Sequence, residues 1–422
     1  MKRVVVTGLG VVAPNGHNID SFLNSIENGI SGIKHYSRLE EANFRCQVAG
    51  VPDADESVLE SYLAKGNFRG LKSSSVKYSV LSSIEAYLDA GLTIDSEQSD
   101  WDTGCVFGCS VSDHNLIKDV LEAVAEGEPR SLGSRYVAQC MTSGCSAYLS
   151  QLFGFANHVY SNSSACSTGT ESILMAYEKI KAGTAKRMLA GSSTPHSVYM
   201  WGAFDAMRVM CGKYNHEAEK ASRPMSASAG GFIPGCGAAA LVLEDLEVAQ
   251  ARGAKIYAEI LGGAMNCGGQ RNGGTMTAPN NEGVQRCIKN GLKSANISSD
   301  QVDLIVGHLT ATYADKVEVR NWTEALNRSG KDFPYINSLK SMVGHCLSGA
   351  GSIECVSTLL QLHHGFIHPN INCEDMHPEI LELIDADCIP TKKINKDIDI
   401  AVKANFGFGD VNSCIVLKKT IV

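Results

Sequence analysis

The stretch Ser163-Ser164-Ala165-Cys166-Ser167-Thr168-Gly169 places a cysteine between two short runs of small residues. An amphipathic segment follows at once, in residues 171–181, and Gly183 ends it. Its apolar side chains recur at helical spacing: Ile173, Leu174, Tyr177 and Ile180. We therefore expect Cys166 at or near a helix N-terminus, where unpaired N–H groups and the helix dipole favour a thiolate, the nucleophilic form of cysteine.

A buried structural cysteine is the alternative for any one of the 15 cysteines. The number is odd and no C-x-x-C spacing occurs, so the sequence indicates neither a zinc site nor a disulfide framework. A reduced, cytoplasmic setting is the expectation. The apolar run near the N-terminus is soon broken by glycines and Pro14, which predicts a buried strand and turn rather than a signal peptide.

The composition, with 44% hydrophobic and 19% charged residues, is typical of a globular protein. With 422 residues, the protein is too long for one ordinary core, which predicts two domains or two fused halves. The net charge of −8 argues against nucleic-acid binding, and no apolar stretch reaches transmembrane length.

Strand and helix patterns alternate along the chain and predict an α/β fold. The expected strands are 4–6, 104–108, 187–191, 238–244, 255–261, 302–306, 400–404 and 413–418. The expected helices are 76–90, 171–181, 281–294, 316–327 and 351–364. The series restarts near residue 250, so we expect two halves of similar element order, 1–250 and 251–422, packed as one body.

Three further glycine-flanked segments carry groups with chemistry: 306–312, 337–345 and 405–410. The first holds His308 directly after a strand, and the second holds Lys340 five residues before His345. The third is a Gly-Phe-Gly turn around Phe408, whose backbone N–H groups could serve an oxyanion hole. A structural histidine and a plain tight reversal are the alternatives. Loops at strand ends are, however, where α/β proteins assemble sites.

Together these segments resemble the β-ketoacyl-acyl-carrier-protein synthases, condensing enzymes of the thiolase superfamily, and most closely the elongating Cys-His-His type. The resemblance covers essentially the whole chain. It rests on the ordered motifs 3–16, 165–169, 222–224, 254–259, 340–345, 349–354 and 405–409. It implies a duplicated thiolase-like fold in five layers, α-β-α-β-α, assembled as a homodimer or with a chain-length-factor-like homologue.

The resemblance also implies roles. Cys166 matches the nucleophile that takes up an acyl chain, and His308 and His345 match the histidines that stabilise the malonyl enolate. Lys340 and Glu354 match residues that order this network. The backbone N–H groups of Phe408 and Cys166 match the family's oxyanion hole. Phe408 also matches the gate that admits malonate to the site. No redox cofactor or essential metal is implied.

Substrate contacts are implied for Val111, at the floor of the acyl pocket, and for Phe406, Thr310 and Thr312. The partner is an acidic acyl carrier protein, so an acidic enzyme needs a local basic patch for it. The candidates are Lys65, Arg69, Lys72 and Arg208.

Four departures from the family pattern put the substrate in doubt. Leu309 and Asp410 stand where the family has glycine, Ala229 begins a segment that replaces Arg-Asp-Gly-Phe, and Cys236 replaces an acidic residue. We expect Leu309 and Asp410 to change the shape and charge of the pocket entrance, as in a synthase of polyketide-like, polyene or pigment assembly.

Two rival functions stay open. A chain-length-factor-like subunit usually lacks the cysteine, which is present here as Cys166. A thiolase uses a second cysteine near the C-terminus, but Cys414 lies in a strand pattern and is more typical of a core residue.

Overall fold

The computed structural model describes residues 1–63, 70–94 and 97–420. Its main sheet has ten strands in the order β10-β9-β13-β14-β8-β1-β7-β6-β4-β5. These strands are β1 Val4–Val12, β4 Thr103–Gly108, β5 Val159–Tyr160, β6 Arg187–Thr194, β7 Gly237–Asp245, β8 Ala258–Cys267, β9 Leu304–Val306, β10 Tyr335–Asn337, β13 Ile400–Gly407 and β14 Val411–Lys419. Two short antiparallel strand pairs, β2 Ile33–His35 with β3 Val48–Gly50 and β11 Phe366–Ile367 with β12 Ile394–Asn395, form separate sheets.

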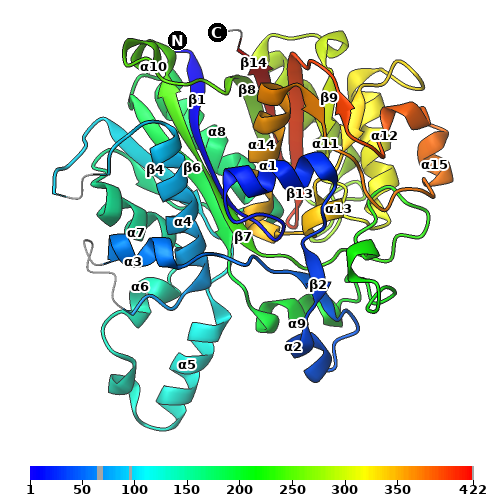
Figure 1. Cartoon of the computed structure of the whole chain (residues 1–422). Helices are drawn as coiled ribbons and strands as arrows, with labels where there is room; N and C mark the ends of the chain where they lie inside the picture. Colours follow the sequence, from blue (N-terminus) through cyan, green and yellow to red (C-terminus); the bar gives the residue numbers. More distant parts are fainter. Residues whose placement is uncertain (64–69, 95–96, 421–422) are drawn as a thin grey trace.

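The helices surround and divide this sheet (Figure 1). The longer ones are α1 Ile19–Asn28, α4 Ser74–Asp89, α5 His114–Ala125, α7 Gly144–Phe153, α8 Thr168–Lys181, α9 Val198–Ala206, α11 Asn281–Ala295, α12 Ala314–Leu326 and α14 Leu347–His364. The shorter ones are α2 Ser37–Glu41, α3 Ser57–Leu63, α6 Tyr136–Cys140, α10 Leu246–Ala251, α13 Lys340–Val343 and α15 Pro378–Leu381. Among the described residues, no helix has both the length and the apolar character needed to cross a bilayer.

The strand pairing repeats itself across the sheet. From β1 outward, the pairs β1–β7 and β7–β6 are antiparallel, and β6–β4 and β4–β5 are parallel. From β8 outward, β8–β14 and β14–β13 are antiparallel, and β13–β9 and β9–β10 are parallel. A short pairing between β1 and β8 joins the two series. The duplicated α/β architecture expected from the sequence is confirmed, whereas the division of the chain at residue 250 stays a prediction.

Side-chain alternation explains the five layers. In β7, Ala239, Leu241 and Leu243 join the central core, while Ala238, Ala240 and Val242 face the opposite core, which contains α4. Successive strand residues point to opposite faces, so a strand that is apolar throughout must be covered on both sides. Helices α4 and α7 cover the outer face of one series, α11 and α12 cover that of the other, and α8 and α14 lie between the two (Figure 1).

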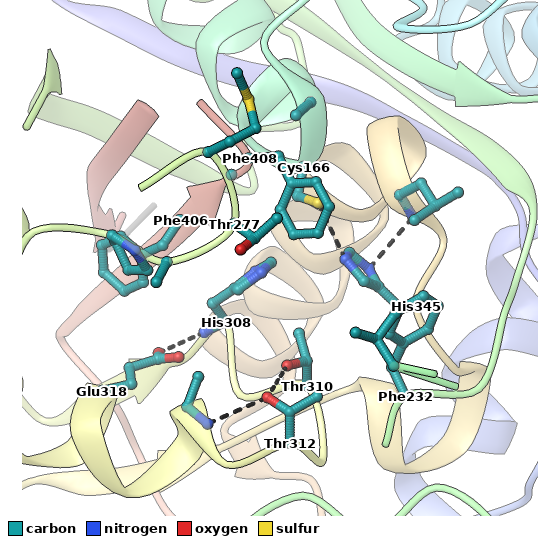
Figure 2. Close-up of a pocket in the computed structure, with 18 of the residues that line it drawn as sticks. Cys166, Phe232, Thr277, His308, Thr310, Thr312, Glu318, His345, Phe406 and Phe408 are labelled. Atoms are coloured by element: carbon teal, nitrogen blue, oxygen red, sulfur yellow. Dashed lines mark hydrogen bonds between the residues drawn. The ribbon is translucent and has the colours of Figure 1, made fainter. Parts of the chain in front are cut away.

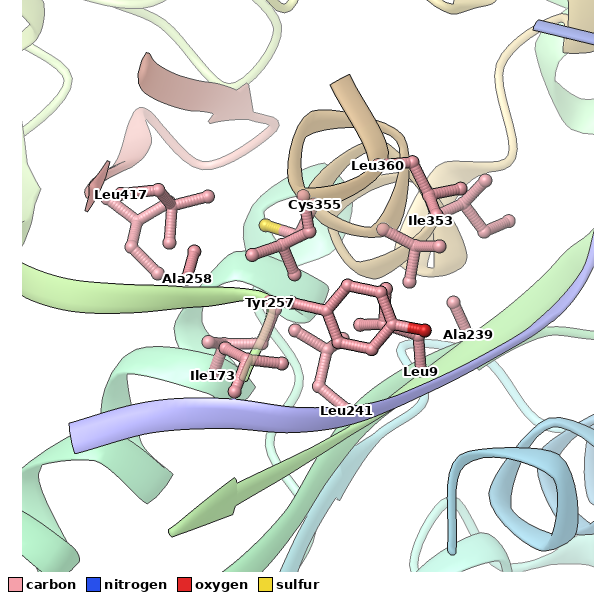
Figure 3. Packing of buried hydrophobic residues seen from close by; sticks show 14 of the residues in the cluster. Leu9, Ile173, Ala239, Leu241, Tyr257, Ala258, Ile353, Cys355, Leu360 and Leu417 are labelled. Atoms are coloured by element: carbon pink, nitrogen blue, oxygen red, sulfur yellow. The ribbon is translucent and has the colours of Figure 1, made fainter. Parts of the chain in front are cut away.

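The central helices meet closely at their N-terminal ends. A Cβ on Gly169 would lie 2.3 Å from the backbone nitrogen of Ser352, and one on Gly351 would lie 2.5 Å from that of Thr170. Glycine is therefore required at both crossing points. Figure 3 shows Ile173 of α8 and Ile353, Cys355 and Leu360 of α14 packed among side chains of β1, β7, β8 and β14.

Two strand boundaries differ from the expectation in a way that matters for the site. The predicted strand 255–261 begins only at Ala258 and continues to Cys267, because it stays paired with β14. The predicted strand 400–404 continues to Gly407, since Asn405 and Phe406 pair with Ser413 and Asn412. Asn405 and Phe406 are therefore strand residues, and the turn comprises residues 408–410 only.

Candidate active site

Cys166 lies in a single 3₁₀ turn, Ala165–Ser167, that leads directly into α8. The preceding residue, Ala165, has a left-handed backbone (φ 47°), which costs free energy for a residue with a Cβ. This bend presents the sulfur of Cys166 to a cavity (Figure 2). The predicted position at a helix N-terminus is confirmed.

His345 lies between α13 and α14 and faces the cysteine. Its Nε2 is 3.1 Å from Sγ of Cys166. The backbone N–H of Leu347 donates to Nδ1 of His345 at 3.3 Å, so the proton of the neutral ring is on Nε2. The ring packs edge-on against Phe232, with 5.4 Å between centroids, which fixes its direction.

His308 follows β9, and its ring lies 5.3 Å from that of His345, nearly perpendicular to it. A carboxylate from α12 holds its backbone: Glu318 accepts the N–H groups of His308 at 2.6 Å and of Leu309 at 2.7 Å. Asp315 does the same for the next residues, Thr310 and Ala311. Neither acid was predicted from the sequence, although Asp315 and Glu318 lie in the first and second turns of α12, the helix that follows His308.

The electrostatics keep both imidazoles neutral. Burial, assisted by the nearby charge of Lys340, lowers the pKa of His308 well below its usual value and that of His345 to about 3. Neutral rings with Nε2–H suit the donation of hydrogen bonds to an oxyanion.

The expectation of a favoured thiolate at rest is wrong. Burial raises the pKa of Cys166 to about 11, and it outweighs the lowering by the Lys340 charge and by the backbone hydrogen bonds from Phe408 and from Cys166 itself. The helix end contributes in the expected direction but is the smaller effect.

Behind the histidines lies a buried group of charges. Glu354 of α14 hydrogen-bonds with Lys340, and its other oxygen lies 2.7 Å from Nζ of Lys403. Burial alone would raise the pKa of Glu354, but the two lysine charges outweigh it and hold that pKa well below its usual range. Lys340 and Glu354 were predicted from the sequence. Lys403 was not, although a lysine within an apolar strand is a signal, because a buried ammonium needs a partner.

The cavity beside these groups has a volume of about 950 Å³ and is mostly apolar. All four predicted substrate-contact residues line it, Val111, Phe406, Thr310 and Thr312, and so does the predicted gate, Phe408. Met207, Met276 and Tyr313 also line it and are exposed, so they mark its entrance.

Neither Leu309 nor Asp410 lines the cavity, so the expectation that their side chains change the shape and charge of the entrance directly is wrong. Leu309 is fully buried in the core beside α11 and α12, and Asp410 is 1% exposed. The Asp410 carboxylate instead accepts the backbone N–H groups of Gln270 and Asn280, each at 2.8 Å. Cys236 is also buried, and Ala229 lies in a half-buried loop; neither lines the cavity.

The docking candidates are scattered. Lys65 and Arg69 lie outside the described residues. Lys72 donates to the hydroxyl of Tyr136 at 2.6 Å, beside Asp119. Arg208 is exposed and lies between Met207 and Val209, which both line the cavity.

Cys166, His308 and His345 bring three possible metal-ligand atoms within 4.8 Å of one another. Sulfur and imidazole are zinc-type ligands. Because His345 uses Nδ1 as an acceptor, however, its Nε2 carries a proton and faces the sulfur as a donor. The arrangement suits hydrogen-bond donation better than metal binding.

Comparison with known proteins identifies the family. The Beta-ketoacyl synthase N-terminal domain matches residues 1–249, and the C-terminal domain matches residues 257–374. The chain belongs to the β-ketoacyl synthase family. It is 34% identical to 3-oxoacyl-[acyl-carrier-protein] synthase 2 of Vibrio harveyi and 35% identical to 3-oxoacyl-[acyl-carrier-protein] synthase 1 of Haemophilus influenzae, in each case over 99% of both chains.

Solved ketosynthase structures share the thiolase-like fold of this β-ketoacyl synthase along its full length. A β-ketoacyl synthase from Burkholderia phymatum superposes with a TM-score of 0.90 at 27% identity. A chain of a type II polyketide synthase acyl-carrier protein in complex with its ketosynthase bound to the hexaketide superposes with a TM-score of 0.86 at 30% identity. Both matches cover 100% of each chain.

Proposed function

We propose that this protein is a 3-oxoacyl-[acyl-carrier-protein] synthase. It condenses an acyl group held on Cys166 with malonyl carrier protein, in fatty-acid synthesis or in a specialised polyketide or polyene pathway. The observation that carries the proposal is the 3.1 Å contact between Sγ of Cys166 and Nε2 of His345, with His308 beside it, at the end of an apolar cavity.

The reaction proceeds in two stages. The Cys166 sulfur attacks an acyl thioester, and the carrier thiol leaves with the cysteine proton. Malonyl carrier protein then enters, and its C–C bond breaks to release carbon dioxide. The Nε2–H groups of His308 and His345 stabilise the enolate that remains. The enolate carbon attacks the carbonyl carbon of the Cys166 thioester, and the bond from that carbon to Sγ breaks. Cys166 leaves as a thiolate that takes up a proton from water, and 3-oxoacyl carrier protein is released.

The backbone N–H groups of Cys166 and Phe408 stabilise the oxyanion in both acyl transfers. This role is supported by the interaction of both N–H groups with the Cys166 sulfur. Phe408 also acts as the gate, in a turn next to the cavity, with its ring 6.1 Å from that of Phe204. The nucleophile belongs to residues 1–250 and both histidines belong to 251–422, the two halves of the proposed division.

The acidic acyl-carrier protein docks at the cavity entrance, where the Arg208 side chain contacts it. Two copies of this chain form a homodimer through the edge strand β5. Exposed apolar side chains of α5 and of the segment around α6 add to the interface: Leu121, Val124, Val137 and Met141. The enzyme works in the cytoplasm, consistent with 15 free cysteines.

The test is the mass of the Cys166 peptide after incubation with a panel of acyl carrier proteins. An acyl adduct on Cys166, and its loss in Cys166→Ala together with condensation, support the function. Cys166→Gln should still decarboxylate malonyl carrier protein, because the histidines remain. A Cys166→Ala protein that forms 3-oxoacyl product at near-normal rate contradicts it.

A chain-length-factor-like subunit is the second candidate, but the presence of Cys166 with both histidines disfavours it. The two candidate functions predict different requirements for activity in solution. A homodimer that condenses without another subunit supports the synthase, while activity that requires a second, homologous chain supports the heterodimer.

A further inference from the structure

Asn405 of β13 lies between the buried charges and one of the histidines. Its Nδ2 lies 3.1 Å from Nδ1 of His308 and 3.0 Å from Oε2 of Glu354. Its Oδ1 accepts a hydrogen bond from the hydroxyl of Thr170 at 2.7 Å and another from the Lys403 ammonium. Asn405 is fully buried, so its side-chain amide makes its hydrogen bonds with these four groups and not with solvent.

These neighbours allow only one orientation of the amide. The ammonium of Lys403 can only donate, so the amide oxygen must face it. The Glu354 carboxylate is ionised between two lysines and can only accept, so the amide nitrogen must face it. The same nitrogen then faces Nδ1 of His308, and Nδ1 must be an acceptor.

The tautomer of His308 follows. A neutral imidazole that accepts at Nδ1 carries its proton at Nε2, and Figure 2 shows the ring extending from the strand end toward Cys166. Without the amide, the nearest strong acceptor behind the ring would be Glu354. A carboxylate behind a histidine draws the proton to Nδ1 and favours the imidazolium.

We propose that Asn405, oriented by Lys403 and Thr170, is a positioning residue that holds His308 as the neutral Nε2–H tautomer and separates it from Glu354. This proposal rests on the proposed function, since Nε2–H is the group that would stabilise the malonyl enolate.

The surrounding charges agree with it. Lys340 and Lys403 against Glu354 leave one excess positive charge next to His308, which disfavours a further positive charge on the ring. The groups near the His308 ring are Lys340, His345, Lys403 and, across the site, Cys166; Glu318 binds the His308 backbone N–H, and Glu354 lies on the other side of Asn405.

The first measurement leaves Asn405 unchanged. Nitrogen-15 spectra of histidine-labelled wild-type protein, with His308→Ala to assign the signal, report which ring nitrogen carries the proton. We expect a protonated Nε2 and a bare Nδ1 for His308 at pH 7. A proton on Nδ1 overturns the proposal, whether or not the protein proves to be a synthase.

The second measurement uses Asn405→Asp, which places an acceptor on Nδ1 and offsets the excess positive charge. It is made in a Cys166→Gln background so that the thiol does not titrate, with malonyl carrier protein decarboxylation followed from pH 5.5 to 9. At low pH the ring is an imidazolium and keeps Nε2–H, so the rate stays within about tenfold of the parent. As the pH rises, the ring loses its Nε2 proton and the rate falls by about 10²–10³-fold, the usual cost of one oxyanion donor.

The matched control is Asn337→Asp, another buried asparagine, whose side chain donates instead to Gln361 at 2.8 Å. It should show no new alkaline loss. A pH-independent loss in Asn405→Asp, or the same alkaline loss in the control, indicates a structural role and overturns the proposal. If the parent itself does not decarboxylate, the proposed function fails, and the nitrogen-15 spectra of wild-type protein and Asn405→Asp still show whether Asn405 sets the tautomer of His308.

Discussion

Each reactive residue lies within two residues of one with a left-handed backbone. Ala165 (φ 47°) precedes Cys166, Leu309 (φ 22°) follows His308, and Leu347 (φ 45°) comes two after His345. Non-glycine residues adopt such angles at a cost of about 1–3 kcal/mol each, and they persist only where the surroundings enforce them. All three flank the reactive residues, so the backbone strain here serves to position the site at a cost in folding stability.

Cys166 should react as a thiol of high pKa. Burial raises its pKa to about 11, so the thiolate fraction, and the rate of alkylation by iodoacetamide, should climb about tenfold per pH unit from pH 7 to 9.5. A simple peptide thiol, with a pKa of about 8.5, should level off in that range. Peptide mass spectrometry separates Cys166 from the other cysteines. A rate that is already flat below pH 8 would show that the helix end and Lys340 outweigh burial.

At the scale of single elements, the chain-length limit should lie after β4. Val111 lines the cavity and packs against the core that contains α4. Val111→Phe should block acylation by long chains while it spares short ones, since overpacking a closed pocket costs about 1–3 kcal/mol. Acylation rates with short and long acyl carrier proteins are compared with thermal stability. Equal losses for all chains with a lower Tm would indicate ordinary core packing, and an unchanged profile in a stable protein would place the limit elsewhere.

The segment 268–280 should depend on Asp410. It contributes Gly273, Met276 and Pro279 to the cavity wall, and Gly409 donates to the Met276 carbonyl at 2.8 Å. Asp410→Gly would relieve a left-handed backbone (φ 62°) but leave the N–H groups of Gln270 and Asn280 without their carboxylate.

Hydrogen bonds to charged groups contribute about 1.5–3 kcal/mol each, so these two amides should exchange with solvent at least tenfold faster in Asp410→Gly. Amides in α4, on the far side of the sheet, are the internal control. Asp410→Asn keeps one acceptor oxygen and should protect one of the two amides. Unchanged exchange at both amides in the glycine variant would mean that the segment is held by other contacts.

Sequence patterns located the parts of the site but not their connections. Cys166 precedes an amphipathic helix pattern, His308 follows an apolar strand, and His345 lies in a glycine-flanked segment. The strand β7 is apolar from Gly237 to Leu243, as a strand covered on both faces must be. Asn405 was assigned to a turn, because glycines follow it closely, and only pairing with Ser413 keeps it in the strand. The effect of Asp410 also depended on tertiary structure, since its partners Gln270 and Asn280 lie 140 and 130 residues earlier in the chain.

For the whole molecule, the site exists only where the two strand series meet. Cys166 precedes α8 of one series and His345 precedes α14 of the other, and the glycines Gly169 and Gly351 let these helix ends approach. The burial that joins the series also removes titratable groups from water. Stability should therefore depend on pH through buried histidines as well as through carboxylates.

His368 allows that dependence to be measured away from the cavity. It is fully buried after β11, with Nδ1 3.0 Å from the carbonyl of Pro369, and burial lowers its pKa to about 4. Below pH 6.5 the unfolded chain binds a proton at this residue and the folded protein does not, until the pH reaches about 4. The free energy of unfolding should therefore fall on acidification through this window, by up to about 1.4 kcal/mol per pH unit from His368 alone.

His368→Gln removes this contribution and keeps an N–H donor for Pro369. Urea unfolding at pH 6.5, 5.5 and 4.5, at one protein concentration, should give a shallower loss of stability for the variant. His308 and His345, whose pKa values are also lowered, remain and keep part of the slope. Parallel lines for the two proteins would mean that His368 takes up its proton in the folded state as readily as in the unfolded chain.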